Sequence, residues 1–241
     1  MGKRYMEVFQ AFDGVTGFFS FRDGASDGYP YNRDDVFREL GLEGAFPVWP
    51  KQVHGSRIEV IGKMPSEPLW LHDTDGAVTD QKDVLLTTVH ADCLPVYFYD
   101  PQRKVIGLVH AGWRGTVAAI AAKAVYEMKR AFGCKSDDIN AYIGPGISRC
   151  CFETGREVYE EFSSLWDFMP QVTDIKKVES GETKYYIDLK EINRRQLTAA
   201  GIASENIETS PHCTFCEPEL FCSYRREGGT YKRMGAGLCL R

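Results

Sequence analysis

Two short segments of the chain contain residue types that hold metal ions or act as nucleophiles. One is His-Ala-Asp-Cys at positions 90–93, and the other is His-Ala-Gly-Trp-Arg-Gly at positions 110–115. A third candidate, His54, stands in Lys-Gln-Val-His-Gly at positions 51–55. One thiolate and two imidazoles form a borderline-soft ligand set that suits zinc, or copper. His54, Cys93 and His110 are therefore a candidate metal trio, and three protein ligands leave one coordination position open for chemistry.

The same residues permit other interpretations. Cys93 and His110 also make up the minimum of a thiol nucleophile with its base. A free cysteine is often simply a small core residue, and His110 could be a core histidine bonded to a backbone carbonyl. The scattered spacing of positions 54, 93 and 110 is not a metal signature by itself, so the residues alone leave these alternatives open.

Carboxylates and arginines near these segments could serve the same chemistry. Asp75 and Asp92 are the carboxylates nearest to the motifs in sequence, and Asp92 could equally orient a metal ligand. The guanidinium group of arginine matches phosphate and carboxylate geometry, although most arginines are only surface charge. The candidates are Arg22, Arg114, Arg225 and Arg226.

A second group of cysteines lies toward the C-terminus. Cys213 and Cys216 form a Cys-x-x-Cys pair, and Cys222 follows. Such a pair suggests zinc or redox chemistry, but it is a weak signal without a second pair. The cytidine-deaminase pattern requires a His-x-Glu, which none of the five histidines opens. The adjacent Cys150 and Cys151 are interpreted as ordinary buried thiols.

Apolar and β-branched runs predict the elements that carry the first two segments. We expect buried strands at 84–89, 95–99 and 104–109, so that the candidate residues stand at strand ends, where a sheet holds them rigidly. Cys93 and His110 could meet if the strands from 84 and 104 are neighbours. Apolar residues at three- and four-residue spacing then predict a helix over 117–132, capped by Thr116 and ended by Gly133.

The remaining patterns are mixed. They predict strands at 18–21, 141–143, 184–187, 221–224 and 236–240, and helices at 153–165 and 189–200. Strands and helices do not alternate cleanly, which favours an α+β or layered α/β fold over a doubly wound sheet. Neither common nucleotide-binding glycine loop is present. We expect one domain over residues 1–241.

Composition narrows the functional classes. The chain has 241 residues, 26% of them charged, and a net charge of −5. These values are ordinary for a globular protein and argue against a broad nucleic-acid-binding surface. No apolar run approaches the roughly 18 residues of a membrane span, and no apolar signal core follows the N-terminus. We therefore expect a cytoplasmic protein that binds no membrane, with cysteines that are thiols, ligands or nucleophiles.

The motifs around His54, Cys93 and His110 match those of a known family. The chain resembles the bacterial laccase-domain family, described both as polyphenol oxidoreductase and as purine nucleoside phosphorylase. The pairing of Ala-Asp-Cys-Leu-Pro with His-Ala-Gly-Trp-Arg-Gly is highly specific, and the likeness runs from about residue 18 to the C-terminus. The matching segments are 51–55, 75–79, 91–95, 109–115, 143–145, 151–153, 188–189, 213–214 and 223–226.

The resemblance implies a zinc site made by a His, a Cys and a His, which map onto His54, Cys93 and His110. It implies phosphorolysis of adenosine, inosine and methylthioadenosine, with adenosine deamination as a second activity. The implied fold is a layered α/β sandwich with mixed sheets and outer helices, related to the catalytic domain of cytotoxic necrotizing factor. The expected partners are purine nucleosides and phosphate, and the expected state is a monomer or weak homodimer.

Within that reading, we assign Cys93, His110, Asp75 and Asp92 to catalysis. Arg114 is the first candidate for holding phosphate, followed by Arg22 and Arg226. A metal-free thiol hydrolase or amidase using Cys93 and His110 is the first alternative. A conventional multicopper laccase needs about ten histidines, according to what is known of that class, whereas this chain has five and no His-x-His. A single copper at the trio remains an option.

Two departures from the family pattern affect the site. The early loop between Arg22 and Arg33 lacks a Ser-Leu-Asn-Leu stretch that the family usually has, which bears on substrate specificity if that stretch lines the pocket. His90 stands where the family often has Thr, and we interpret it as a neutral structural histidine.

Overall fold

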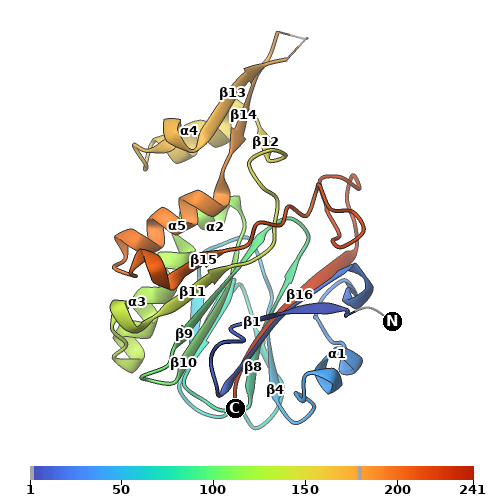
Figure 1. Cartoon of the computed structure of the whole chain (residues 1–241), viewed down its shortest axis with the longest axis vertical. Coiled ribbons are helices and arrows are strands. Elements are labelled where there is room, and N and C mark those ends of the chain that lie inside the picture. The colour runs from blue at the N-terminus through green and yellow to red at the C-terminus, as the bar shows by residue number, and fades with distance from the viewer. Residues whose placement is uncertain (1–2, 179–180) are drawn as a thin grey trace.

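Two large β-sheets stack face to face in this protein (Figure 1). A computed structural model describes residues 3–178 and 181–241. The first sheet has the strand order β1-β2-β16-β8-β4-β6, and β3 pairs with one end of β16. Its strands are β1 (Tyr5–Val8), β2 (Val15–Ser20), β3 (Ser26–Asp27), β4 (Phe46–Pro50), β6 (Leu69–Leu71), β8 (Val84–His90) and β16 (Lys232–Leu240).

The second sheet has the order β15-β11-β9-β10-β7-β5. Its strands are β5 (Ile58–Ile61), β7 (Gly76–Thr79), β9 (Leu94–Asp100), β10 (Val105–Ala111), β11 (Asn140–Ile143) and β15 (Ile207–Thr209). The pairs β11–β15 and β5–β7 are parallel and the remaining pairs are antiparallel. The first sheet also mixes both directions, because β4 pairs in parallel with β8 and β6.

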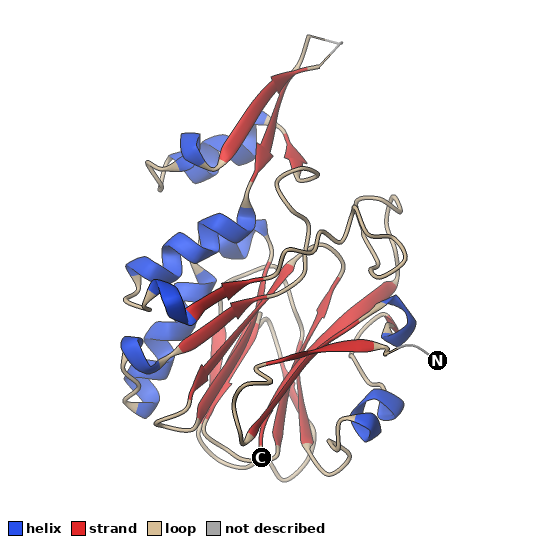
Figure 2. Cartoon of the chain, in the orientation of Figure 1, coloured by secondary structure: helices blue, strands red, loops and turns tan. Residues whose placement is uncertain are grey.

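Helices cover the outer faces of both sheets (Figure 2). These helices are α1 (Asp34–Glu39), α2 (Trp113–Val117), α3 (Ile120–Phe132) and α5 (Leu189–Ala199), whereas α4 (Arg156–Ser163) lies apart from the two large sheets. One apolar cluster joins α3 and α5 to the second sheet, a second fills the space between the sheets, and a third joins α1 to the first sheet. The result is the layered α+β sandwich with mixed sheets and outer helices that the sequence predicts.

A third, small sheet stands apart from these layers. It consists of β12 (Glu153–Thr154), β14 (Thr183–Ile187) and β13 (Thr173–Lys177) in antiparallel order, and α4 packs beside it (Figure 1). Over residues 3–178 and 181–241, no helix has the length and apolar character needed to cross a bilayer.

The predicted strands at 84–89, 95–99 and 104–109 are confirmed as β8, β9 and β10. Cys93 and His110 do not meet through pairing of the first and third of these strands, because β8 belongs to the first sheet and β10 to the second. Cys93 instead follows β8 in the turn into β9, and β9 pairs with β10 so that Pro95 stands opposite His110. A crossing between the two sheets therefore brings Cys93 to His110.

The helix predicted over 117–132 is divided in two. Ala119 adopts a left-handed conformation (φ 56°), which ends α2 before α3 begins. Thr116 lies inside α2, where its hydroxyl accepts from Asn193 Nδ2 at 3.1 Å instead of capping a helix. The stop at Gly133 is confirmed, since this residue is left-handed (φ 67°) and its N–H caps α3.

Two further predictions differ from the structure. Residues 221–223 form a loop that leads into a turn from Tyr224, and not a strand, because Ser223 and the backbone of Arg225 bond to Asp92 while Phe221 is buried in the core. The helix predicted from 153 begins only at Arg156, after the extended Gly155. The helix at 189–200 is confirmed as α5, with Asp188 accepting from the N–H of Glu191 as its cap.

Candidate metal centre and cavity

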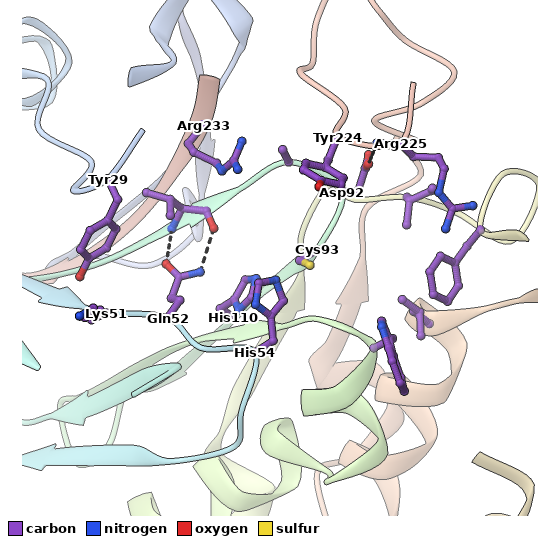
Figure 3. A pocket seen from close by; sticks show the side chains of 16 residues that line it. Tyr29, Lys51, Gln52, His54, Asp92, Cys93, His110, Tyr224, Arg225 and Arg233 are labelled. Carbon is purple, nitrogen blue, oxygen red and sulfur yellow. Dashed lines mark hydrogen bonds between the residues drawn. The ribbon is translucent and has the colours of Figure 1, made fainter. Parts of the chain in front are cut away.

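The three expected ligands meet in the structure. One ligand atom each from His54, Cys93 and His110 lies within 4.8 Å of the other two (Figure 3). The imidazole rings of His54 and His110 stand edge to face, with centroids 5.0 Å apart. Ligand atoms of a tetrahedral zinc ion stand about 3.3–3.8 Å apart, given bond lengths of about 2.0–2.3 Å. The trio therefore fits such an ion after a small inward adjustment of its side chains.

Asp75 fixes two of the three candidate ligands. Its buried carboxylate accepts from His110 Nδ1 at 2.8 Å. It also accepts from the backbone N–H groups of Val53 at 3.2 Å, His54 at 3.0 Å and Gly55 at 2.7 Å. The bond to Nδ1 leaves Nε2 of His110 to face the trio. The three N–H bonds hold the loop in which His54 takes a left-handed conformation (φ 60°).

In the chain without metal, the trio already carries separated charge. Burial opposes ionisation of Cys93, but the two imidazoles outweigh it and lower its pKa to about 6. Burial likewise opposes protonation of His110, but Cys93 and Asp75 outweigh it and raise its pKa to about 9. At neutral pH the pair is a thiolate beside an imidazolium, and the thiolate is the form that binds metals and attacks electrophiles.

Gly112 leaves room at the centre of the trio. A Cβ atom on this residue would lie 3.1 Å from Cys93 Sγ and 3.2 Å from His54 Cδ2. The missing side chain therefore leaves unfilled the space that an ion and its fourth ligand would need.

His90 is a neutral structural residue, as the sequence analysis expects. Its Nδ1 bonds to the carbonyl of Cys93 at 3.0 Å, and its Nε2 lies 2.8 Å from the Thr88 hydroxyl. Because a carbonyl only accepts, the proton stands on Nδ1 and Nε2 accepts from Thr88. Burial lowers the pKa of His90 well below its usual value, which keeps the ring neutral.

Asp92 holds a loop in place rather than presenting a free carboxylate. It accepts from Thr214 Oγ1 at 2.7 Å, Ser223 Oγ at 3.0 Å and the N–H of Arg225 at 2.8 Å. Its left-handed backbone (φ 88°) stands directly before Cys93. Asp92 therefore joins the turn that carries Cys93 to the segment 214–225.

A cavity of about 610 Å³ opens over the trio. This volume lies in the usual range for small-molecule sites. Aromatic and apolar groups form much of the wall, and three cationic side chains stand among them (Figure 3). Besides the trio, the lining residues are Tyr29, Lys51, Gln52, Val89, Ala91, Asp92, Trp113, Ile147, Phe152, Leu189, Tyr224, Arg225 and Arg233.

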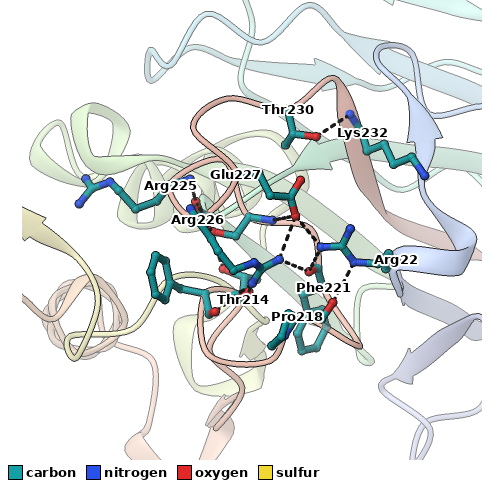
Figure 4. Close-up of polar contacts among 12 residues, drawn as sticks. Arg22, Thr214, Pro218, Phe221, Arg225, Arg226, Glu227, Thr230 and Lys232 are labelled. Carbon is teal, nitrogen blue, oxygen red and sulfur yellow. Dashed lines mark hydrogen bonds and ion pairs between the residues drawn. The ribbon is translucent and has the colours of Figure 1, made fainter.

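The three arginines expected to bind phosphate lie outside this lining. Arg22 donates to the carbonyls of Pro218 and Phe221 and pairs with Glu227 (Figure 4). Arg226 donates to the carbonyls of Thr214, Phe215 and Phe221. Both guanidinium groups are thereby used to fasten a loop.

Arg114 is exposed, and its guanidinium lies 4.2 Å from the ring centroid of Trp113. The arginines that do line the cavity are Arg225 and Arg233.

The sequence did not predict most of the residues that line the cavity. Arg225 and Tyr224 belong to the Ser-Tyr-Arg-Arg segment that carries the family likeness, so a local signal existed but the neighbouring Arg226 was preferred. Arg233 on β16 and Tyr29 in the early loop have no local signal. Gln52 lies in the His54 motif, and its amide bonds both ways to the backbone of Val89, at 2.7 and 2.9 Å.

Fold and site together define an α+β sandwich protein with a candidate His-Cys-His metal centre at the bottom of a cavity. A family model described as multi-copper polyphenol oxidoreductase laccase matches residues 17–241. The chain therefore belongs to this laccase-domain family, as its motifs indicate.

Several curated relatives carry enzyme names. Purine nucleoside phosphorylase YlmD of Bacillus subtilis is 38% identical over 193 residues, which cover 78% of this chain and 68% of the relative. A purine nucleoside phosphorylase of Bacteroides thetaiotaomicron is 37% identical, covering 97% of this chain and 94% of the relative. Adenosine deaminase RL5, from an unknown prokaryotic organism, is 36% identical over 83% of this chain and 77% of its own length.

Solved structures share the whole fold. The Bacillus licheniformis hypothetical protein YfiH superposes with a TM-score of 0.88 at 31% identity, covering 99% of this chain and 97% of the other. YlmD from Geobacillus stearothermophilus gives a TM-score of 0.85 at 30% identity, covering 100% and 97%.

Proposed function

We propose that this chain is a zinc-dependent purine nucleoside phosphorylase acting on adenosine, inosine and methylthioadenosine, with adenosine deamination as a second activity. The observation that carries the proposal is the meeting of His54, Cys93 and His110 at the bottom of a nucleoside-sized cavity. Relatives named purine nucleoside phosphorylase and adenosine deaminase support the substrate class. We also propose that residues 1–241 form a single domain.

A bound zinc ion would supply Lewis acidity, polarising a water, phosphate or substrate oxygen. In phosphorolysis a phosphate oxygen bonds to C1′ of the ribose while the bond from C1′ to the purine nitrogen breaks. The purine leaves with the bonding electron pair and takes up a proton, and ribose 1-phosphate is the other product. Deamination replaces the purine amino group with oxygen from water and releases ammonia.

The cavity lining holds both aromatic rings and cationic groups, and the Arg225 guanidinium lies 5.8 Å from the ring centroid of Phe152. Trp113, Phe152 and Tyr224 provide aromatic faces on which a purine can stack. Arg225 and Arg233 provide guanidinium groups, and Lys51 an ammonium, for phosphate. We therefore assign phosphate binding to these cations in place of Arg22, Arg114 and Arg226.

The two expected catalytic carboxylates receive a different role. Asp75 and Asp92 each accept at least three hydrogen bonds from protein donors, so neither is free to shuttle a proton. Asp75 is a positioning residue for His110 and the His54 loop, and Asp92 is one for the turn that carries Cys93. Cys93 and His110 keep their place at the reacting centre.

The test is product analysis with zinc-loaded protein. Inosine should yield hypoxanthine only when phosphate is present, with one ribose 1-phosphate formed per base released. Adenosine should yield adenine with phosphate and inosine in its absence. Cys93→Ala should abolish these products, whereas Cys134→Ala, a change at a buried thiol outside the cavity lining, should retain them. The absence of any base release or deamination by zinc-loaded protein would refute the proposal.

A second candidate function follows from the same residues. Asp75, His110 and Cys93 form a chain of contacts in which a thiolate stands beside an oriented imidazolium. This arrangement also fits a metal-free thiol hydrolase or amidase. Full activity on amide or ester substrates after chelator treatment, lost in Cys93→Ala, would favour it over the nucleoside enzyme.

The family description suggests a third candidate, oxidation of polyphenols. The chain has five histidines, too few for the multinuclear centres of conventional multicopper oxidases. One copper at the trio is the most that this site could supply. Oxygen consumption with a polyphenol and copper-loaded protein, lost in His54→Ala, would support this activity.

A further inference from the structure

Four cysteines that the proposed function does not use come together at the surface. Cys150 Sγ lies 3.4 Å from Cys151 Sγ, 3.9 Å from Cys213 Sγ and 3.7 Å from Cys216 Sγ. Cys151 Sγ and Cys216 Sγ are 3.3 Å apart, and all four sulfur atoms lie within 4.8 Å of one another. Cys222, which follows in sequence, is buried and does not belong to this group.

These separations match a metal bound by four thiolates. A zinc–sulfur bond is about 2.3 Å long, so the sulfur atoms at the corners of a zinc tetrahedron stand about 3.8 Å apart. Four of the six sulfur–sulfur separations run from 3.3 to 3.9 Å, and the other two are no longer than 4.8 Å. The sulfur atoms are therefore already close to the positions that zinc requires.

The chain topology explains why sequence spacing does not reveal the site. Cys150 and Cys151 stand in the segment between β11 and β12, whereas Cys213 and Cys216 stand in the loop after β15. A β-bridge between Gly146 and Cys213 joins the two segments. The Cys-x-x-Cys pair thus finds its second pair more than 60 residues away, and that second pair is vicinal.

Two groups of the surrounding protein interact with the cluster: the backbone N–H of Ser148 and the ammonium of Lys190. The N–H of Ser148 donates to Cys213 Sγ at 3.4 Å. The ammonium of Lys190 is buried, donates to the carbonyls of Ser210 and His212, and interacts electrostatically with Cys213 and Cys150.

We propose that Cys150, Cys151, Cys213 and Cys216 form a structural zinc site, separate from the His54–Cys93–His110 trio. Four protein ligands close the coordination sphere, which is the arrangement of structural and not catalytic zinc. Binding of one Zn²⁺ converts the four thiols to thiolates and releases their protons to solvent, with no change in oxidation state.

The site joins a segment that lines the cavity to a segment that bonds to Asp92. Ile147 and Phe152 flank the vicinal pair and line the cavity. On the other segment, Thr214 stands inside the Cys-x-x-Cys pair and donates to Asp92. Zinc at the four cysteines would therefore hold the wall of the cavity beside the turn that carries Cys93.

The test uses a variant that lacks one ligand of the trio, so that the zinc bound per chain reports on the four-cysteine site. Cys93→Ala protein, purified under reducing conditions, should hold one zinc per chain. X-ray absorption at the zinc edge should show four sulfur neighbours at about 2.3 Å. Adding Cys216→Ala should abolish this zinc, whereas adding the matched change Cys222→Ala should preserve it. These outcomes do not depend on whether the chain acts on nucleosides.

Three results would overturn the site: Cys93→Ala protein that takes up no zinc, zinc whose neighbours are nitrogen and oxygen, or zinc retained after Cys216→Ala. Should that variant fail to fold, the unmutated chain supplies a second measurement. Cys150 and Cys216 are exposed, yet both should resist alkylation until a strong chelator is added and should then react together. Rapid alkylation of both in zinc-loaded protein, or a disulfide between Cys151 and Cys216 in freshly reduced protein, would equally refute it.

Discussion

Asp75→Asn is the most informative single change at the candidate centre. The two carboxylate oxygens of Asp75 divide their donors: Oδ1 accepts from His54 N and His110 Nδ1, and Oδ2 accepts from Val53 N and Gly55 N. Asparagine offers one accepting oxygen and one NH₂ group. If the NH₂ faces Val53 and Gly55, both of those hydrogen bonds are lost. If it faces His54 and His110, the bond from His54 N is lost, and His110 Nδ1 stays bonded only by accepting, which moves its proton to Nε2, the nitrogen that faces the trio.

The consequence should appear in metal affinity. Loss of a group that orients a metal-bound histidine typically lowers affinity by about 10–100-fold, or about 1.4–2.7 kcal/mol. Because the change also removes the negative charge beside His110 and disturbs the loop of His54, we expect the upper part of that range. Because Asp75 is buried, each polar group left unpaired should also lower the free energy of unfolding by about 1–3 kcal/mol, so zinc binding is compared in protein that circular dichroism shows to be folded.

Protection of Cys93 from alkylation reports this affinity at the right site. Metal-free protein is equilibrated at a series of buffered free-zinc concentrations and treated briefly with iodoacetamide, and the Cys93 peptide is quantified by mass spectrometry. The free zinc that gives half-protection should rise about 10–100-fold in Asp75→Asn. Asp80→Asn, a matched change at an exposed carboxylate, should leave it unchanged. An unaltered midpoint in folded Asp75→Asn protein would refute the role of Asp75.

Four further results are expected. Gly112→Ala, whose Cβ would press on Cys93 and His54, should weaken zinc binding more than tenfold in the same assay, whereas Gly62→Ala, with open space around its Cβ, should not. In metal-free protein the alkylation rate of Cys93 should rise with pH through about 6, where its thiolate forms, and a midpoint near 8.5, the value of an ordinary thiol, would contradict the thiolate–imidazolium pair. Asp92→Asn should lower the free energy of unfolding by roughly 1–3 kcal/mol in urea titrations, because bonds from Thr214, Ser223 and Arg225 to a buried carboxylate are replaced by bonds to a neutral amide, whose NH₂ forces at least one of them to reverse or break, and an unchanged value would contradict this role. Arg225→Gln should raise the KM for phosphate about 10–100-fold with Arg114→Gln unchanged, and equal KM values in the two variants would remove Arg225 from the phosphate site.

Local pattern was enough to predict much of the secondary structure. The strands β8, β9 and β10 are continuous apolar runs because both of their faces are buried, and such runs are visible in a single sequence. The stop of α3 at Gly133 follows from the left-handed conformation that glycine adopts easily. The strand prediction at 221–224 is wrong because the buried Phe221 and Cys222 give the apolar pattern of a strand. The bonds to Asp92 that shape this segment come from a distant part of the chain.

The trio could be proposed because residue chemistry alone selects a thiol and two imidazoles. Its route of assembly could not, since the pairing of β9 with β10 across two sheets depends on tertiary packing. The placement of the arginines also depends on tertiary contacts. Arg225 and Arg226 are adjacent, but Arg226 donates to three loop carbonyls, whereas Arg225 donates to the carbonyl of Glu153 and lines the cavity.

The four-cysteine cluster shows the same limit. Neither pair of cysteines predicts a metal site by itself, because a single Cys-x-x-Cys is a weak signal and a vicinal pair is usually two buried thiols. The bridge between Gly146 and Cys213 unites them, and that bridge has no local sequence signal. The likeness to the catalytic domain of cytotoxic necrotizing factor stays a prediction.

The central claim is that His54, Cys93 and His110 hold one divalent ion whose fourth position opens into the cavity. A crystal structure with inosine, with anomalous data at the zinc edge, tests it most directly. We expect a peak at about 2.0–2.1 Å from one nitrogen of each histidine and about 2.3 Å from the sulfur, with the nucleoside in the cavity on its open side. A trio without an ion in fully zinc-loaded crystals, or an ion enclosed by a fourth protein ligand, would contradict the account.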